Sequence, residues 1–265
     1  MRGVAGPSDQ FETEDGACPE AVPLTEEQAK KLPLGAFTLL ASGDIFEMAQ
    51  GRPPPDGLAR AREYVARMLH LEPHGASAAH LERVRGDVAR QLSGNLQLLA
   101  RLSASRPIAV DLIPEGKAIA KFGYPARVSK NAAGLFWDDP KWPQARMALR
   151  QDKLDETPQL VVHEMAHAIH YLAFTEAERE LIYKLLLRTF RSHAAVDEVF
   201  AVYSEREFLE TFSDRDRRAP GVYGAARKMW SEDHVFTRFV RNLYFPYKKL
   251  AGPKLGADGW KQFGG

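Results

Sequence analysis

The stretch Gln159–Leu172 is the feature that most restricts how this chain can fold. A threonine and a proline precede it, and this pair is typical of a helix start, with threonine as the N-cap and proline at the first helical position. Most residues of the stretch are apolar, so the predicted helix belongs in the protein core. Its polar side chains His163, Glu164 and His167 would then be buried, which is costly unless something pairs with them.

The spacing of these side chains predicts a metal site. His163 and His167 lie four residues apart, so both imidazoles project from one face of the helix. Two such nitrogens can bind one Zn²⁺ at about 2.0–2.1 Å each. Glu164 is offset from both and can reach a metal-activated water without becoming a ligand. We therefore predict one Zn²⁺, with Glu164 as general base, and we predict that the nearby His170 is structural or supports a ligand.

A catalytic zinc ion takes three protein ligands and keeps one open position, so a third ligand must lie downstream. The pattern His-x-x-Gly-x-x-His does not follow the motif, which disfavours a site with three histidines. A glutamate from a later helix is the usual alternative. The segment 197–214 contains three candidates, Glu198, Glu207 and Glu210.

The segment Tyr203-Ser-Glu-Arg-Glu-Phe-Leu-Glu-Thr-Phe-Ser-Asp214 resembles the active-site helix of the lethal-factor-like metallopeptidases, which include the Pro-Pro endopeptidases. In that family a tyrosine lies seven residues before the ligand glutamate, and an acidic residue four after it supports a zinc histidine. The resemblance covers about residues 130–245. It implies Glu210 as the third ligand, Tyr203 as a hydrogen-bond donor to the developing oxyanion, and Asp214 as the support of a zinc histidine.

Two other glutamates match parts of these patterns. Glu207 is followed by phenylalanine and lies at the third position of its predicted helix, as the family ligand does, but this choice would put Phe200 and Thr211 where the tyrosine and the acid belong. Glu198, in Asp-Glu-Val-Phe-Ala, is similar to the ligand helix of other glutamate-type zinc peptidases. Glu210 is the preferred ligand at this point.

The pattern along the whole chain predicts an α+β fold. We expect a mostly helical, zincin-like catalytic domain with a small mixed β-sheet before the motif helix, preceded by a helical N-terminal region. Apolar periodicity, capping boxes and proline-bounded apolar runs carry this prediction. The expected helices cover residues 58–71, 78–102, 157–172, 175–192, 204–214 and 225–244, and the expected strands cover residues 107–114, 118–122, 133–137 and 145–150.

Segments rich in glycine and proline suggest how the chain is divided. The first 23 residues have few large apolar side chains and are expected to be a flexible tail. The run Gly51–Gly57 contains three consecutive prolines and is expected to be a stiff connector. The predicted regions are a tail at 1–23, a helical region at 24–105, the metallopeptidase domain at 106–250 and a C-terminal tail at 251–265.

Composition excludes several classes of protein. The 36 basic and 35 acidic residues give a net charge of +1, without the basic excess of most nucleic-acid binders. No apolar run approaches the 18 or so residues of a membrane span. The single cysteine, Cys18, excludes internal disulfides and a thiolate zinc site. The N-terminus lacks the apolar core of a signal peptide, so we expect a cytoplasmic protein or a leaderless secreted effector.

These patterns together predict a zinc-dependent peptidase of the glutamate-ligand (gluzincin) type. Its partner is expected to be a peptide or protein substrate, bound in extended form along an edge strand within residues 131–150. Nucleic acid and membranes are not expected as partners. The alternative is a non-proteolytic zinc-binding regulatory or effector module with a degenerate peptidase fold. The intact Glu164 argues against that alternative, because a purely structural zinc site has no use for an unliganded base.

Overall fold

The computed structural model describes residues 34–42, 53–129, 132–208, 221–230 and 234–246. Over these residues the fold is α+β, mostly helical with a small mixed sheet, as predicted. The strands are β1 (Leu69–Glu72), β2 (Ile108–Ile113), β3 (Gly134–Trp137) and β4 (Ala145–Arg150). The helices are α2 (Gly35–Ser42), α3 (Gly57–Met68), α4 (Ala78–Leu92), α5 (Leu96–Ser103), the 3-10 helix η1 (Ile119–Phe122), α6 (Ala126–Ser129), α7 (Gln151–Glu156), α8 (Leu160–Leu172), α9 (Glu176–Phe190), α10 (His193–Phe208), α12 (Gly221–Met229) and α13 (Val235–Tyr244).

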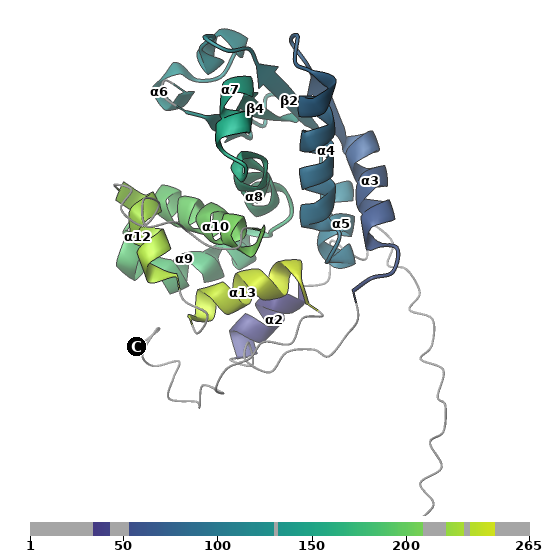
Figure 1. Cartoon of the computed structure of the whole chain (residues 1–265). Coiled ribbons are helices and arrows are strands. Elements are labelled where there is room, and N and C mark those ends of the chain that lie inside the picture. The colour runs from purple at the N-terminus through teal and green to yellow at the C-terminus, as the bar shows by residue number, and fades with distance from the viewer. Residues whose placement is uncertain (1–33, 43–52, 130–131, 209–220, 231–233, 247–265) are drawn as a thin grey trace, which may run out of the picture.

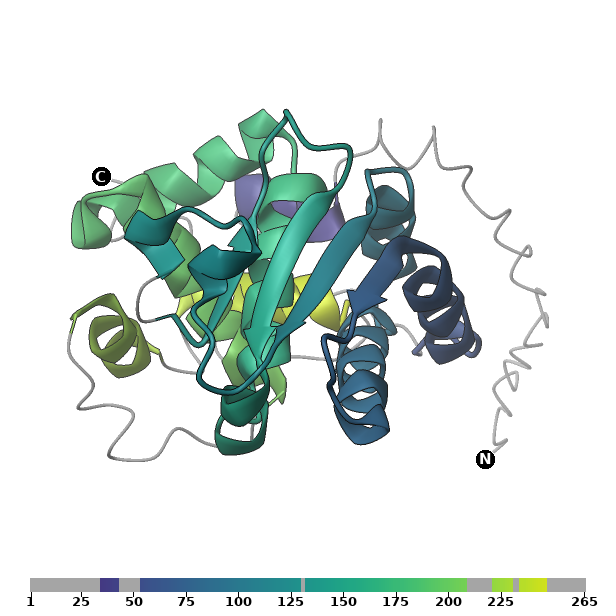
Figure 2. The same cartoon turned by 90° about the horizontal axis from the view of Figure 1, so that it is seen from above.

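The four strands lie in the order β1-β2-β4-β3. The first three are parallel, whereas β3 runs antiparallel to β4, with Gly134 opposite Leu149 and Trp137 opposite Arg146. Figure 2 looks onto the sheet, with α3 beside its β1 edge. Among the described residues β3 has β4 as its one strand neighbour, so β3 forms the opposite edge of the sheet.

The motif helix α8 lies in the middle of the fold. Figure 1 shows it between the sheet above and the helices α9, α10 and α13 below, with α4 at its side. Alternate side chains of β2 and β4 share one apolar core with α8, whereas Ile113 and Ala148 face the other side of the sheet and pack on residues 119–124. Because α8 is surrounded by other elements, its apolar residues are nearly all buried.

A chain of hydrogen bonds fixes α8 relative to three other helices. The Gln91 amide on α4 donates to the Val162 carbonyl of α8 and to the Tyr244 hydroxyl of α13, both at 3.1 Å. The Tyr244 hydroxyl in turn donates to the Ser204 hydroxyl on α10 at 2.9 Å. These groups are buried, so losing one partner would leave another unpaired in the core. The network holds the two helices that carry the motif and Glu198 in a fixed relation.

Several predicted elements are confirmed. The strands predicted at 107–114, 133–137 and 145–150 correspond to β2, β3 and β4. The motif helix ends at Leu172 as expected, although it begins at Leu160, after Gln159 rather than Thr157 as its N-cap. Thr175 and Glu178 form the predicted capping box of α9.

Other predicted elements are wrong. The helix expected over 58–71 stops at Met68, because Leu69–Glu72 pairs with β2 as a parallel strand, and short apolar runs fit either pattern. The strand expected over 118–122 is η1, which ends at Gly123 with a φ of +89°. The helix expected over 78–102 is two helices, α4 and α5, and the helix expected over 225–244 is also two helices, α12 and α13.

The helix start predicted at Ser204 is also wrong. Helix α10 runs through this residue without a break, and the Ser204 hydroxyl donates to the Phe200 carbonyl one turn earlier at 2.8 Å. Serine inside a helix commonly makes this bond, so a Ser-x-x-Glu pattern does not by itself mark a helix start. Consequently Glu198 and Glu205 belong to one helix.

No helix in the described part of the chain combines the length and the apolar character needed to cross a membrane.

Candidate metal centre

Helix α8 holds the two motif histidines with their ring nitrogens facing each other. The Nε2 atoms of His163 and His167 lie 3.3 Å apart, and the ring centroids are 5.0 Å apart. His163 is 6% exposed, and Glu164 is 5% exposed. Two imidazole nitrogens at this separation, within an apolar helix, are positioned to bind one cation between them.

Glu198 of α10 completes the ligand group. Its Oε2 lies 3.4 Å from His163 Nε2, and its Oε1 lies 3.8 Å from His167 Nε2. One ligand atom from each of these three residues falls within 4.8 Å of the other two. Glu198 Oε2 is also buried without a hydrogen bond of normal geometry. Two nitrogens and one carboxylate oxygen form the donor set of a catalytic zinc site with an open fourth position, so these residues fit the metal.

Glu205 supports the first of the two histidines. It lies seven residues after Glu198, two helical turns along α10, and therefore on the same face of the helix. Its Oε1 is 2.7 Å from His163 Nδ1, and its Oε2 is 3.3 Å from the Arg227 guanidinium on α12. Because an ionised carboxylate only accepts hydrogen bonds, it holds a proton on Nδ1 and leaves Nε2 to face the ligand group.

Asp197 anchors the α10 backbone beside Glu198. Its carboxylate accepts hydrogen bonds from the Tyr171 hydroxyl and from the Tyr183 hydroxyl, the latter at 3.1 Å, and it lies 3.1 Å from His170 Nε2. His170 is fully buried and contributes no atom to the ligand group. The predicted structural role of His170 agrees with these contacts.

Glu164 lies between α8 and the edge strand β3. The nearby backbone N–H of Phe136 favours the ionised form of the Glu164 carboxylate and lowers its pKa, against the larger effect of burial. A side chain at Gly134 would collide with this group, because a Cβ atom there would come within 2.6 Å of Glu164 Oε1. The close approach of β3 therefore requires glycine at this position and holds the carboxylate beside the two histidines.

Burial and neighbouring charges shift the pKa values of the site. Burial raises the pKa of Glu164 to about 7. Burial, together with the charge of His163, lowers the pKa of His167 to about 4. Burial disfavours the charged form of Glu198, but the His163 and His167 rings outweigh it and lower the pKa of Glu198 to about 2. Glu164 therefore has the pKa of a group that can both take up and release a proton near neutral pH.

Of the residues that the family resemblance implies, the structure describes Tyr203 alone. Glu210 and Asp214 lie outside the described residues. Glu207 pairs with the Arg241 guanidinium on α13 at 2.9 Å and is not in the ligand group. Tyr203 does not take the expected place at the oxyanion, because its ring is fully buried against α13, 5.1 Å from the Phe236 ring. Of the two candidate glutamates that the structure describes, Glu198 is the one that lies beside both histidines, and Glu207 is not.

Two residues of the site were not predicted. Glu205 could have been found from its seven-residue spacing to Glu198, but the expected helix start at Ser204 separated the two. Tyr223, on α12, stacks on the His163 ring at a centroid distance of 5.8 Å. Its hydroxyl interacts with the Glu198 carboxylate, which after burial is the main reason that the pKa of Tyr223 is raised. No sequence spacing links α12 to the motif, so this contact is visible only in the fold.

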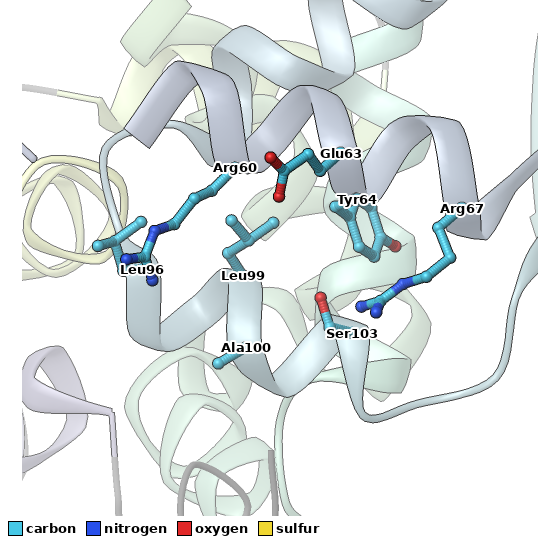
Figure 3. Close-up of a pocket in the computed structure, with 8 residues that line it drawn as sticks. All are labelled: Arg60, Glu63, Tyr64, Arg67, Leu96, Leu99, Ala100 and Ser103. Carbon is cyan, nitrogen blue, oxygen red and sulfur yellow. The ribbon is translucent and has the colours of Figure 1, made fainter. Parts of the chain in front are cut away.

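A surface pocket lies elsewhere, between α3 and α5 (Figure 3). No residue of α8, β3, α10 or α12 lines it, so it is separate from the ligand group. Its lining residues are Arg60, Glu63, Tyr64, Arg67, Leu96, Leu99, Ala100 and Ser103.

Comparison of the chain with family models, curated proteins and solved structures gives no match, so the site is interpreted from its own geometry.

Proposed function

We propose that this protein is a zinc-dependent peptidase with a zincin-like fold, in which His163, His167 and Glu198 hold one Zn²⁺. The observation that carries this proposal is the meeting of three ligand atoms within 4.8 Å of one another, beside a buried carboxylate that is not among them. A structural zinc site has four protein ligands, whereas a catalytic site has three and an open position. The unliganded Glu164 therefore favours catalysis over a structural role.

The substrate we propose is a peptide or protein segment in extended form. The edge strand β3 lies directly against Glu164, and in the described fold its outer side is not paired with another strand. An extended peptide can add to such an edge through backbone hydrogen bonds. A peptide bound in this way would place one of its carbonyls beside the ligand group, because Gly134 and Phe136 of β3 both lie next to the Glu164 carboxylate.

The reaction that we propose is hydrolysis of the peptide bond. Zinc, when bound, supplies an activated water and polarises the peptide carbonyl. Glu164 accepts a proton from the attacking water as the new bond to the carbonyl carbon forms and the carbonyl π electrons move onto the oxygen. When the C–N bond breaks, those electrons restore the carbonyl and Glu164 delivers its proton to the leaving amine. Glu205 keeps His163 oriented throughout, with Nδ1 protonated.

Removal of the metal tests this proposal. The zinc-loaded protein is expected to cleave members of a mixed fluorogenic peptide library, and 1,10-phenanthroline is expected to abolish cleavage. Added Zn²⁺ should then restore it, because His163, His167 and Glu198 remain intact. Zinc bound at one ion per chain without cleavage of any peptide would instead favour a non-proteolytic zinc-binding module.

Substitution of Glu205 tests the support of the histidine. Glu205→Gln keeps the shape of the side chain but removes the charge that holds the proton on His163 Nδ1. We expect zinc affinity to fall by about 10–100-fold, as is typical for the loss of an outer carboxylate partner. Competition with a chromophoric chelator measures this affinity. Glu207→Gln, on the same helix but paired with Arg241, is the matched control and should leave zinc affinity unchanged.

A further inference from the structure

Helix α12 presents a tyrosine to the ligand group. The Tyr223 side chain is 39% exposed, whereas the histidine on which it stacks is buried. Its ring lies nearly parallel to that of His163, with an angle of 28° between the two planes. The two ring centroids are 5.8 Å apart, and the Tyr223 hydroxyl interacts with the nearby carboxylate of Glu198. The phenol therefore lies at the solvent side of the metal ligands, where a substrate would arrive.

A second contact ties α12 to the same site. Arg227, one turn after Tyr223, pairs with Glu205 at 3.3 Å, and Glu205 in turn holds the His163 ring. The guanidinium carbon of Arg227 lies 5.9 Å from the centre of the Tyr223 ring. Helix α12 packs along α10, which carries Glu198 and Glu205 (Figure 1). The ion pair between Arg227 and Glu205 and the packing of α12 on α10 thus fix Tyr223 beside His163.

The other tyrosines near the site are engaged differently. The Tyr171 hydroxyl donates to Asp197, which anchors α10. The Tyr203 ring is fully buried against α13. Tyr223 is the one of these three whose ring stacks on a ligand of the proposed metal and also reaches solvent.

We propose that Tyr223 is a catalytic residue that donates its hydroxyl hydrogen bond to the oxyanion of the tetrahedral intermediate. The inference rests on the proposed peptidase function. As the carbonyl oxygen gains charge beside the ligand group, the phenol hydroxyl donates to this oxygen. The hydroxyl keeps its proton, so the step forms a hydrogen bond and breaks no covalent bond. A fixed donor at a developing oxyanion lowers the barrier because the charge appears only in the transition state.

The test compares Tyr223→Phe with Tyr203→Phe. Each variant loses one hydroxyl from a ring and keeps the ring itself. With the library peptide that the wild-type protein cleaves fastest, Tyr223→Phe is expected to lower kcat by about 10²–10³, the effect of removing one oxyanion donor, and to leave KM nearly unchanged. Tyr203→Phe is expected to keep the wild-type kcat. Zinc affinity, measured on both proteins by chelator competition, is expected to equal that of the wild type.

Three results would overturn the inference. An unchanged kcat in Tyr223→Phe, with active wild-type protein, would remove the catalytic role and leave the proposed function standing. A loss of zinc affinity that matches the loss of kcat would make Tyr223 a positioning residue for Glu198. A wild-type protein that binds zinc and cleaves no peptide would overturn the proposed function and this inference together.

Discussion

Replacement of Glu198 by alanine is expected to remove zinc from the protein and with it all peptidase activity. Among the described residues, the Glu198 carboxylate is the one oxygen donor of the proposed ligand group, whose other two members are the motif histidines. Without it the two histidines alone would hold the ion. We expect zinc affinity to fall by more than the roughly 10–100-fold that follows loss of an outer carboxylate. Chelator competition and metal analysis after dialysis measure the effect.

Two controls make the Glu198 result specific. Glu207→Ala removes a carboxylate from the same helix, but this carboxylate pairs with Arg241. Glu210→Ala removes the glutamate that the family resemblance implies as the ligand. Both variants are expected to keep wild-type zinc affinity. Zinc binding that survives in Glu198→Ala and is lost in Glu210→Ala would show that Glu198 had been assigned wrongly.

Replacement of Glu164 by glutamine is expected to leave zinc bound and to stop hydrolysis. Glutamine keeps the size of the side chain but cannot accept the proton of the attacking water. General base catalysis contributes about 10²–10⁴-fold in rate, so we expect kcat to fall by at least that range. Zinc content should stay at one ion per chain, because Glu164 is not in the ligand group. Kinetics and metal analysis of the same sample separate the two effects.

Thermal unfolding is the control for Glu164→Gln. Burial raises the pKa of Glu164 to about 7 in the fold, above its ordinary value, so the ionised carboxylate destabilises the folded state as the pH rises through that range. At pH 8 the neutral glutamine is therefore not expected to lower the Tm. Turnover that stays at the wild-type rate, with Tm and zinc content also unchanged, would reject Glu164 as the base.

The motif helix and most of the sheet could be predicted because their signals are local. The apolar pattern around His163 and His167 defines a buried helix, and proline-bounded apolar runs define strands such as β2. The strand β1 could not be predicted, since its four residues continue the helical pattern of α3 and their strand form depends on pairing with β2. Such pairing between distant segments overrides local propensity.

The third ligand could not be decided from the sequence because several glutamates follow one another closely. The choice depended on where α10 begins, and the Ser-x-x-Glu pattern at Ser204 suggested a start in the middle of that helix. Once α10 is continuous, helical phase places Glu198 and Glu205 on one face. The residue seven positions before Glu198 is Arg191, so the tyrosine implied by the resemblance does not occur at that spacing. Tyr223 reaches the site through the packing of α12 alone.

Anomalous diffraction at the zinc edge, from crystals grown with Zn²⁺, tests most directly whether His163, His167 and Glu198 share one ion. A single peak is expected at about 2.0–2.1 Å from Nε2 of each histidine and at about 2.0–2.2 Å from a carboxylate oxygen of Glu198. A peak bound to a different glutamate, or no peak between the two histidines, would contradict the assignment.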